Sequence, residues 1–215
     1  MKVIKYPQAC LMIETNGTKI LVDPGCLKYQ DKYFEAWQTA DVVLATHKHA
    51  DHINEGVLSK YAMPIYATEE VKKEFPELPI KVIKVADVFE FDGVKVEVVK
   101  AVHGYNPNLK NGKEVFENVG YIIDDGRIRL YAAGDTICFN HDYKADVVAL
   151  PVTGHGLTMS SYEAALLTKE MGAKLLLPVH MDNEMYPTDV ESMKKTFNKF
   201  NIEYQVLDIE EKIEL

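Results

Sequence analysis

The chain of 215 residues carries a net charge of −9, with 47% hydrophobic and 27% charged residues, which is ordinary for a soluble globular protein. Arg127 and Arg129 are its only arginines, so the sequence lacks the basic stripes that bind phosphate backbones, and nucleic acid is excluded as a partner. The sequence shows no secretory signal and no apolar run of about 18 residues, so we expect a cytoplasmic protein without a membrane partner.

Short apolar runs typical of β-strands alternate with turn residues along the chain. An Asn-Gly pair at 16–17 and Asp-Gly pairs at 92–93 and 125–126 each stand between two such runs, which is a strong signal for a β-hairpin. The predicted strands span residues 10–15, 18–23, 41–46, 81–85, 88–91, 94–102, 119–124, 127–134, 146–152, 174–179 and 202–209.

Four helices are predicted between these strands, at residues 54–62, 68–75, 160–173 and 189–200. Thr68 followed by two glutamates is typical of a helix start, and Gly172 of a helix end. No linker divides the chain, so we expect a single domain over residues 1–215. The sequence Ala-Asp-Val-Val at 40–43 returns at 145–148, and each copy leads into a loop with a histidine, which hints at two similar halves.

The cysteines Cys10, Cys26 and Cys138 are widely spaced and include no Cys-x-x-Cys pair. This pattern indicates neither a disulfide framework nor a thiolate zinc site. We therefore expect buried free thiols in a reducing compartment.

Four of the apolar runs end, on their C-terminal side, in histidine or aspartate. If these ends lie on one edge of the fold, five imidazoles and two carboxylates converge there. A single surface histidine is usually no ligand, but the segment "THKHADH" at 46–52 places three histidines and an aspartate together. The seven candidate ligands are His47, His49, Asp51, His52, His103, Asp135 and His180.

The spacing of the first four candidates suits metal binding. In extended backbone, His47 and His49 point the same way, about 6.5 Å apart at their Cα atoms, while Lys48 points outward. Asp51 and His52 lie where the chain turns into a helix, within reach of a second cation. Seven ligands suit two metal ions, because a catalytic zinc takes about three protein ligands plus water. Imidazole with carboxylate fits Zn²⁺ best, with Mn²⁺ or Fe as alternatives.

"THKHADH", the isolated His103, "GDT" at 134–136 and "PVHMDN" at 178–183 resemble the metallo-β-lactamase superfamily of metal-dependent hydrolases. The resemblance covers nearly the whole chain, including "TKILVDPG" at 18–25. It implies an α+β fold, a four-layer αββα sandwich of two mixed β-sheets flanked by helices, with a dinuclear metal site at the sheet edge. By the same resemblance, one metal would be held by His47, His49 and His103, the other by Asp51, His52 and His180, and Asp135 would bridge them.

The sequence lacks features of the larger subfamilies, and this narrows the choice of subfamily. We expect no antibiotic hydrolysis, since there is no export signal, and no glyoxalase II-like helical domain, since only 35 residues follow His180. The nucleic-acid-processing members carry basic surfaces that this sequence lacks. The di-iron members have Glu where His49 stands. The small single-domain hydrolases remain, and "LPVTGHGLTMSSYEAA" at 150–165 resembles the L-ascorbate 6-phosphate lactonase-like group.

The expected function is a metal-dependent hydrolase that uses a metal-bound hydroxide to cleave an ester, lactone or phosphodiester bond of a small cytoplasmic substrate. Asp51 is a candidate proton acceptor. His155 is a candidate proton donor to the leaving group, because it stands in a strand-to-helix loop like the ligands; a hydrogen-bonded loop histidine is the competing interpretation.

Other interpretations stay open at this point. Asp23 is either the carboxylate that orients a ligand histidine or a turn residue before Pro24. Tyr105 and Asn106 either line the substrate pocket or only belong to a polar loop. A di-iron oxidoreductase on the same scaffold and a non-catalytic metal-binding module are the alternative functions. The sequence does not indicate the oligomeric state.

Overall fold

The structure is a computed structural model, and it describes residues 1–105 and 114–215. A seven-stranded sheet runs in the order β13-β1-β2-β3-β4-β5-β6. Its strands are β1 (Lys2–Lys5), β2 (Leu11–Thr15), β3 (Thr18–Val22), β4 (Val42–Leu44), β5 (Ile65–Ala67), β6 (Ile80–Val82) and β13 (Lys212–Glu214). The pairs from β13 to β3 are antiparallel and those from β3 to β6 are parallel, so the sheet is mixed.

A second, six-stranded sheet runs in the order β12-β11-β10-β9-β8-β7. Its strands are β7 (Val88–Phe91), β8 (Val94–Lys100), β9 (Val119–Asp124), β10 (Arg129–Ala132), β11 (Val147–Pro151) and β12 (Leu175–Val179). The pairs from β7 to β10 are antiparallel and those from β10 to β12 are parallel. The two sheets therefore repeat one arrangement, in which antiparallel strands lead into parallel ones, four in the first sheet and three in the second.

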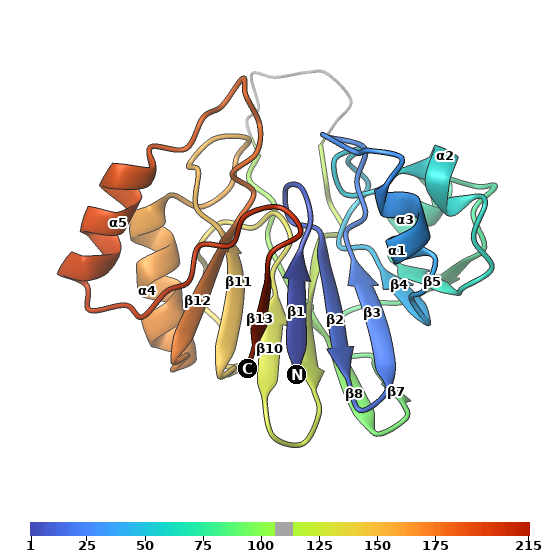
Figure 1. The fold of residues 1–215 in the computed structure, drawn as a ribbon, viewed down its shortest axis with the longest axis horizontal. Coiled ribbons are helices and arrows are strands. Elements are labelled where there is room, and N and C mark those ends of the chain that lie inside the picture. The colour runs from blue at the N-terminus through green and yellow to red at the C-terminus, as the bar shows by residue number, and fades with distance from the viewer. Residues whose placement is uncertain (106–113) are drawn as a thin grey trace.

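Helices cover the outer faces of both sheets (Figure 1). The helices are α1 (Tyr33–Trp37), α2 (Glu55–Leu58), α3 (Glu69–Glu74), α4 (Ser161–Met171) and α5 (Val190–Lys199). Alternation of side chains along each strand divides the apolar residues among three layers. Ile20 and Val22 face the other sheet, whereas Leu21 between them packs under Trp37 of α1. Leu150 of β11 packs with α4 and α5 in the same way. The result is the predicted four-layer αββα sandwich.

The short sequence repeat marks equivalent positions in the two sheets. Asp41, before β4, donates its backbone N–H to Lys19 O and accepts the Lys19 N–H with its carboxylate, both at 2.8 Å. Asp146, before β11, makes the same two contacts with Arg129, at 2.8 and 3.1 Å. Each aspartate thus joins the first two parallel strands of its sheet. The predicted likeness of the two halves is confirmed at this level.

Most local predictions agree with the structure. The Asn-Gly and Asp-Gly turns close hairpins at 16–17, 92–93 and 125–128. Thr68 caps α3 by accepting the Val71 N–H, and Gly172 ends α4 at φ 70°, a left-handed conformation that glycine adopts without strain. The elements α1, β1, β5 and β13 have no counterpart in the sequence prediction.

Three predictions are wrong. The strand predicted at 202–209 reduces to one bridge between Tyr204 and Leu176, after which the chain leaves β12. The helix predicted at 54–62 ends at Leu58, because the chain tightens there into turns of the i→i+3 kind. All three cysteines are free, but only Cys10 is buried, while Cys26 is exposed and Cys138 half-buried.

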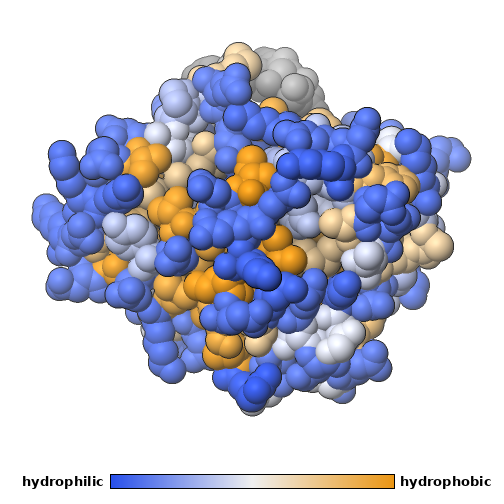
Figure 2. Space-filling view, viewed as in Figure 1, coloured by the Kyte–Doolittle hydropathy of each residue, from blue (hydrophilic) through white to orange (hydrophobic). Residues whose placement is uncertain are grey.

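Hydrophilic residues dominate the face of the molecule seen in Figure 2, and hydrophobic residues form only scattered groups between them. In the described part of the chain, no helix has both the length and the apolar character needed to cross a membrane.

Candidate metal centre

The ends of four strands from both sheets bring all seven predicted ligands together. His47, His49, Asp51 and His52 follow β4, His103 follows β8, Asp135 follows β10, and His180 follows β12 directly. They form two groups, and within each group one ligand atom per residue lies within 4.8 Å of the others. We call His47, His49, His103 and Asp135 the imidazole cluster, and Asp51, His52, Asp135 and His180 the carboxylate cluster.

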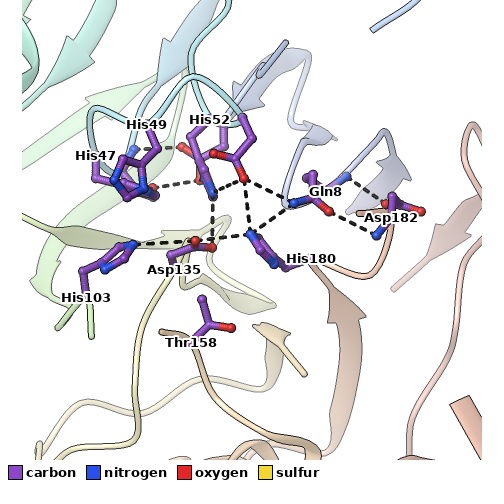
Figure 3. A network of polar contacts seen from close by, with 12 residues as sticks. Gln8, His47, His49, His52, His103, Asp135, Thr158, His180 and Asp182 are labelled. Atoms are coloured by element: carbon purple, nitrogen blue, oxygen red, sulfur yellow. Dashed lines mark hydrogen bonds and ion pairs between the residues drawn. The ribbon is translucent and has the colours of Figure 1, made fainter. Parts of the chain in front are cut away.

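The imidazole cluster places three rings around one point (Figure 3). Nε2 of His47 lies 3.1 Å from Nδ1 of His49, and Nε2 of His103 lies 3.8 Å from Oδ2 of Asp135. The ring of His49 meets those of His47 and His103 edge-on. The side chain of Lys48 points away from this centre, as the alternation of side chains predicts, and forms an ion pair with Glu70.

The carboxylate cluster surrounds the other side of Asp135. Nε2 of His52 lies 3.2 Å from Asp135 Oδ1, and Nε2 of His180 lies 3.2 Å from Asp135 Oδ2. His180 Nε2 also lies 3.4 Å from Asp51 Oδ2. Asp135 is therefore the one residue of the described chain that belongs to both clusters.

Hydrogen bonds at Nδ1 turn three of the rings so that Nε2 faces the clusters. His52 donates from Nδ1 to Asp23 Oδ2 at 2.8 Å, His103 to the Gly104 carbonyl at 2.9 Å, and His47 to Thr46 Oγ1 at 3.0 Å. Such contacts fix both the tautomer and the orientation of a ligand histidine.

Asp23 fixes the positions of His52 and of Thr46 in the loop after β4. Besides the contact with His52, its fully buried carboxylate accepts the Thr46 N–H and hydroxyl, both at 2.8 Å. The structure thus decides between the two interpretations of Asp23 in favour of a carboxylate that orients a ligand histidine. The neighbouring Gly25 is required for space, since a Cβ there would lie 1.7 Å from the Asp51 carbonyl oxygen.

The two clusters differ in how they bind protons. Burial alone would lower the pKa of His52, but Asp135, Asp23 and Asp51 raise it well above its ordinary value. Burial acts the same way on His180, whose pKa Asp135 and Asp51 raise to about 9. The carboxyl groups respond in the opposite sense: burial would raise the pKa of Asp135 and Asp51, but the imidazoles hold both below their ordinary values.

The imidazole cluster has less negative charge nearby. Burial, with His52 adding positive charge, lowers the pKa of His47 well below its ordinary value. Burial likewise lowers the pKa of His103, against the opposing effect of Asp135. Both rings are therefore neutral at pH 7, the form in which imidazole binds a metal ion.

Unsatisfied buried atoms test whether these residues fit a metal ion. Nε2 of His52, Nε2 of His103 and Oδ1 of Asp135 are buried and have no hydrogen-bond partner. His52 Nε2 and Asp135 Oδ1 are 3.2 Å apart without hydrogen-bond geometry, as expected of two atoms that share a cation. An unpaired buried polar atom costs about 1–3 kcal/mol, and a divalent metal ion fits these atoms because it would satisfy all three.

A family model described as "Beta-lactamase superfamily domain" matches residues 2–180. The chain belongs to this superfamily. A UPF0173 metal-dependent hydrolase of Thermoplasma volcanium is 30% identical over 192 residues, covering 84% of this chain and 83% of the relative. A UPF0173 metal-dependent hydrolase of Methanocorpusculum labreanum is 29% identical over 202 residues, covering 88% and 87%. The chain is thus a member of the UPF0173 metal-dependent hydrolase family.

The superfamily fold is confirmed by solved structures. A metallo hydrolase from Ignicoccus hospitalis superimposes with a TM-score of 0.81 at 21% identity, covering 100% of this chain and 98% of the other. The predicted fold class is therefore right, and the UPF0173 relatives confirm the predicted class of metal-dependent hydrolase.

In this beta-lactamase superfamily member, a cavity of about 170 Å³ opens beside the carboxylate cluster. Its described lining is His49, Asp51, Asp135, Thr153, His155, Gly156, His180, Asn183 and Tyr186. His155 is exposed, and its ring stacks on Tyr186 with centroids 5.7 Å apart. Tyr105 is exposed and does not line this cavity, while Asn106 lies outside the described residues.

Gln8 contacts the site although the sequence prediction missed it. Its side-chain Nε2 lies 3.2 Å from both Asp51 Oδ2 and His180 Nε2. Gln8 stands in the turn between β1 and β2, far in sequence from every predicted ligand, in a stretch without a recognisable motif.

Proposed function

We propose that this metal-dependent hydrolase binds two divalent cations, one in each cluster, and cleaves an ester or lactone bond of a small cytoplasmic substrate. The observation that carries the proposal is the position of Asp135 between the two clusters, beside one cavity. Its Oδ2 lies 3.8 Å from His103 Nε2 of the imidazole cluster and 3.2 Å from His180 Nε2 of the carboxylate cluster. Among divalent cations we propose zinc, since five imidazoles and two carboxylates form the ligand set.

The ligands have distinct tasks in this proposal. His47, His49 and His103 hold one cation, Asp51, His52 and His180 hold the other, and Asp135 holds both. Bound divalent cations supply Lewis acidity, which polarises a carbonyl oxygen and lowers the pKa of water from 15.7 toward about 7. The low pKa of Asp51 suits a ligand better than a proton acceptor, because a weakly basic carboxylate takes up protons poorly.

His155 protonates the leaving group. His155 lines the cavity that Asp51, Asp135 and His180 also line, so its imidazole lies beside the space that a substrate would occupy. Stacking on Tyr186 limits the rotation of the ring. His155 belongs to neither cluster, which separates proton donation from metal binding.

The cavity supports a small substrate without a large anionic group. A volume of about 170 Å³ is below the range of about 300–1,000 Å³ typical of ligand pockets. Its described lining includes no lysine and no arginine, so no side-chain cation of that lining is available for a phosphate. This favours an ester or lactone over a phosphodiester. The resemblance of 150–165 to the ascorbate 6-phosphate lactonase-like group supports a lactone in particular.

A substrate screen tests the proposal. Protein loaded with zinc or with manganese is assayed on lactones, carboxylic esters, thioesters and phosphodiesters, before and after complete chelation. We expect hydrolysis of small lactones or esters that disappears on chelation and returns with the metal. Activity that survives chelation would contradict metal catalysis. Redox turnover with iron, or metal binding without turnover of any class, would favour the di-iron or the non-catalytic alternative instead.

A further inference from the structure

Gln8 is fully buried and held at both its backbone and its side chain by the segment that follows β12. The His180 N–H donates to the Gln8 carbonyl at 3.0 Å, and the Gln8 N–H donates to Asp182 Oδ2 at 2.8 Å. The Asp182 N–H donates to Gln8 Oε1 at 3.1 Å. These three hydrogen bonds join the turn between β1 and β2 to the end of the other sheet.

The contact with Asp182 also determines which way the amide of Gln8 points. Only the oxygen of a glutamine amide can accept a backbone N–H, so Oε1 faces Asp182 and Nε2 faces the opposite side. On that side Nε2 lies 3.2 Å from Asp51 Oδ2 and 3.2 Å from His180 Nε2 (Figure 3). Gln8 therefore presents an N–H donor to the carboxylate cluster alone.

A part-buried ion pair holds Asp182 in place on the side away from the clusters. Lys5, whose side chain is 3% exposed, lies with Nζ 2.7 Å from Asp182 Oδ2 and 3.2 Å from the Tyr6 carbonyl. Asp182 Oδ2 thus accepts from Lys5 and from the Gln8 backbone at once. A continuous chain of polar contacts leads from Lys5 through Asp182 and Gln8 to Asp51 and His180.

We propose that Gln8 is a positioning residue for the carboxylate cluster, which strengthens divalent-cation binding there and not in the imidazole cluster. The proposal rests on the two-cation function above. Its physical basis is that the amide, itself held in one orientation, donates to the Asp51 carboxylate and limits its motion, while the Gln8 carbonyl holds the backbone of His180. Groups that orient metal ligands are typically worth about 10–100-fold in metal affinity.

The test is a zinc titration of Gln8→Met against a competing chelator. Methionine has nearly the same length and no N–H, and the backbone hydrogen bonds of residue 8 survive the change. We expect one of two sites to weaken by about 10–100-fold and the other to keep its affinity. His103→Ala and His180→Ala, which each remove a ligand from one cluster, identify the weakened site. Gln38→Met, at an exposed glutamine, is the matched control.

Gln8→Asn is a second variant. It keeps the backbone conformation of this position, because asparagine accepts the positive φ of 60° at residue 8. Its shorter side chain cannot reach Asp51 while it is bonded to Asp182, so the same selective loss is expected. Unchanged affinities in both variants, or equal losses at both sites, would overturn the role of Gln8. A wild-type protein that takes up a single ion would contradict the two-cation proposal itself, whatever the variants do.

Discussion

The imidazole cluster and the carboxylate cluster share Asp135 and yet are built differently. The first consists of three rings and one carboxylate, and burial keeps the pKa of His47 and His103 low. The second has two carboxylates, which raise the pKa of His180 to about 9. His47 and His103 are therefore neutral at pH 7, with Nε2 unprotonated where it faces the first cluster, whereas His180 of the second cluster holds a proton where a cation would bind.

Because of this difference, two identical cations would meet different conditions for binding in the two clusters. A cation enters the imidazole cluster without displacing a proton from His47 or His103, but it must displace protons from the carboxylate cluster. The carboxylate cluster also has more supporting contacts, from Asp23 to His52 and from Gln8 to Asp51 and His180. We therefore expect substitutions near the two clusters to change their metal affinities to different extents.

The largest effect is expected from removing the residue that the clusters share. Asp135→Ala should weaken both metal sites together and lower kcat/KM by about 10⁴-fold or more, because several kcal/mol of charge stabilisation are lost. Metal content by mass spectrometry and initial rates check this. Asp142→Ala, at an exposed aspartate, is the control. Loss of only one ion in Asp135→Ala would show that Asp135 does not bridge.

His155 lies outside both clusters, so its removal should leave the metal affinity of each cluster unchanged. His155→Ala should retain both metals and lower kcat/KM by about 10²–10⁴-fold, the usual contribution of a general acid. The loss should shrink for nitrophenyl esters, whose leaving group needs no proton. Wild-type rates in the variant on substrates with good and poor leaving groups alike would show that His155 is only a loop residue.

Asp23 contacts the carboxylate cluster directly, through His52, and reaches His47 only through Thr46. Asp23→Asn should therefore weaken the carboxylate site by about 10–100-fold and the imidazole site less. Asparagine accepts the positive φ of 47° at this position, so backbone strain does not enter. Isothermal titration with zinc measures both sites. A loss of affinity confined to the imidazole site would show that Asp23 supports that site and not the carboxylate site.

The smallest effect is a difference in pH dependence. Because carboxylates raise the pKa of His180 to about 9, a proton competes with the cation up to that pH. Affinity at the carboxylate site should rise by at least about tenfold per pH unit from neutrality toward pH 9, because His180 and also His52, whose pKa is raised too, must lose a proton. At the imidazole site the pKa values of His47 and His103 are lowered, so affinity should stay nearly constant over the same range. Equal slopes at both sites would contradict the electrostatic comparison.

The sequence was informative where local patterns carry the chemistry. Candidate ligands that follow strands could be grouped because the strands end at one edge of the fold, and the turn pairs set the hairpins. His47 and His49 were recognisable from their spacing alone. Asp23 could be named as a partner of a histidine, but its choice of His52 depends on packing between β3 and the loop after β4.

Features that depend on distant pairing could not be predicted. Gln8 reaches the site only because the turn between β1 and β2 docks on residues 180–182, more than 170 positions away. The segment 202–209 has the composition of a strand, but only Tyr204 pairs with Leu176 of β12 before the chain continues to β13 in the other sheet. The exposure of Cys26 likewise follows from the path of a loop and not from a local pattern.

Anomalous diffraction at the zinc absorption edge, from crystals of zinc-loaded protein, tests the central claim most directly. The account predicts two peaks per chain, one among His47, His49 and His103 and one among Asp51, His52 and His180, with Asp135 in contact with both. A single peak, or two peaks of which one lies away from Asp135, would contradict it.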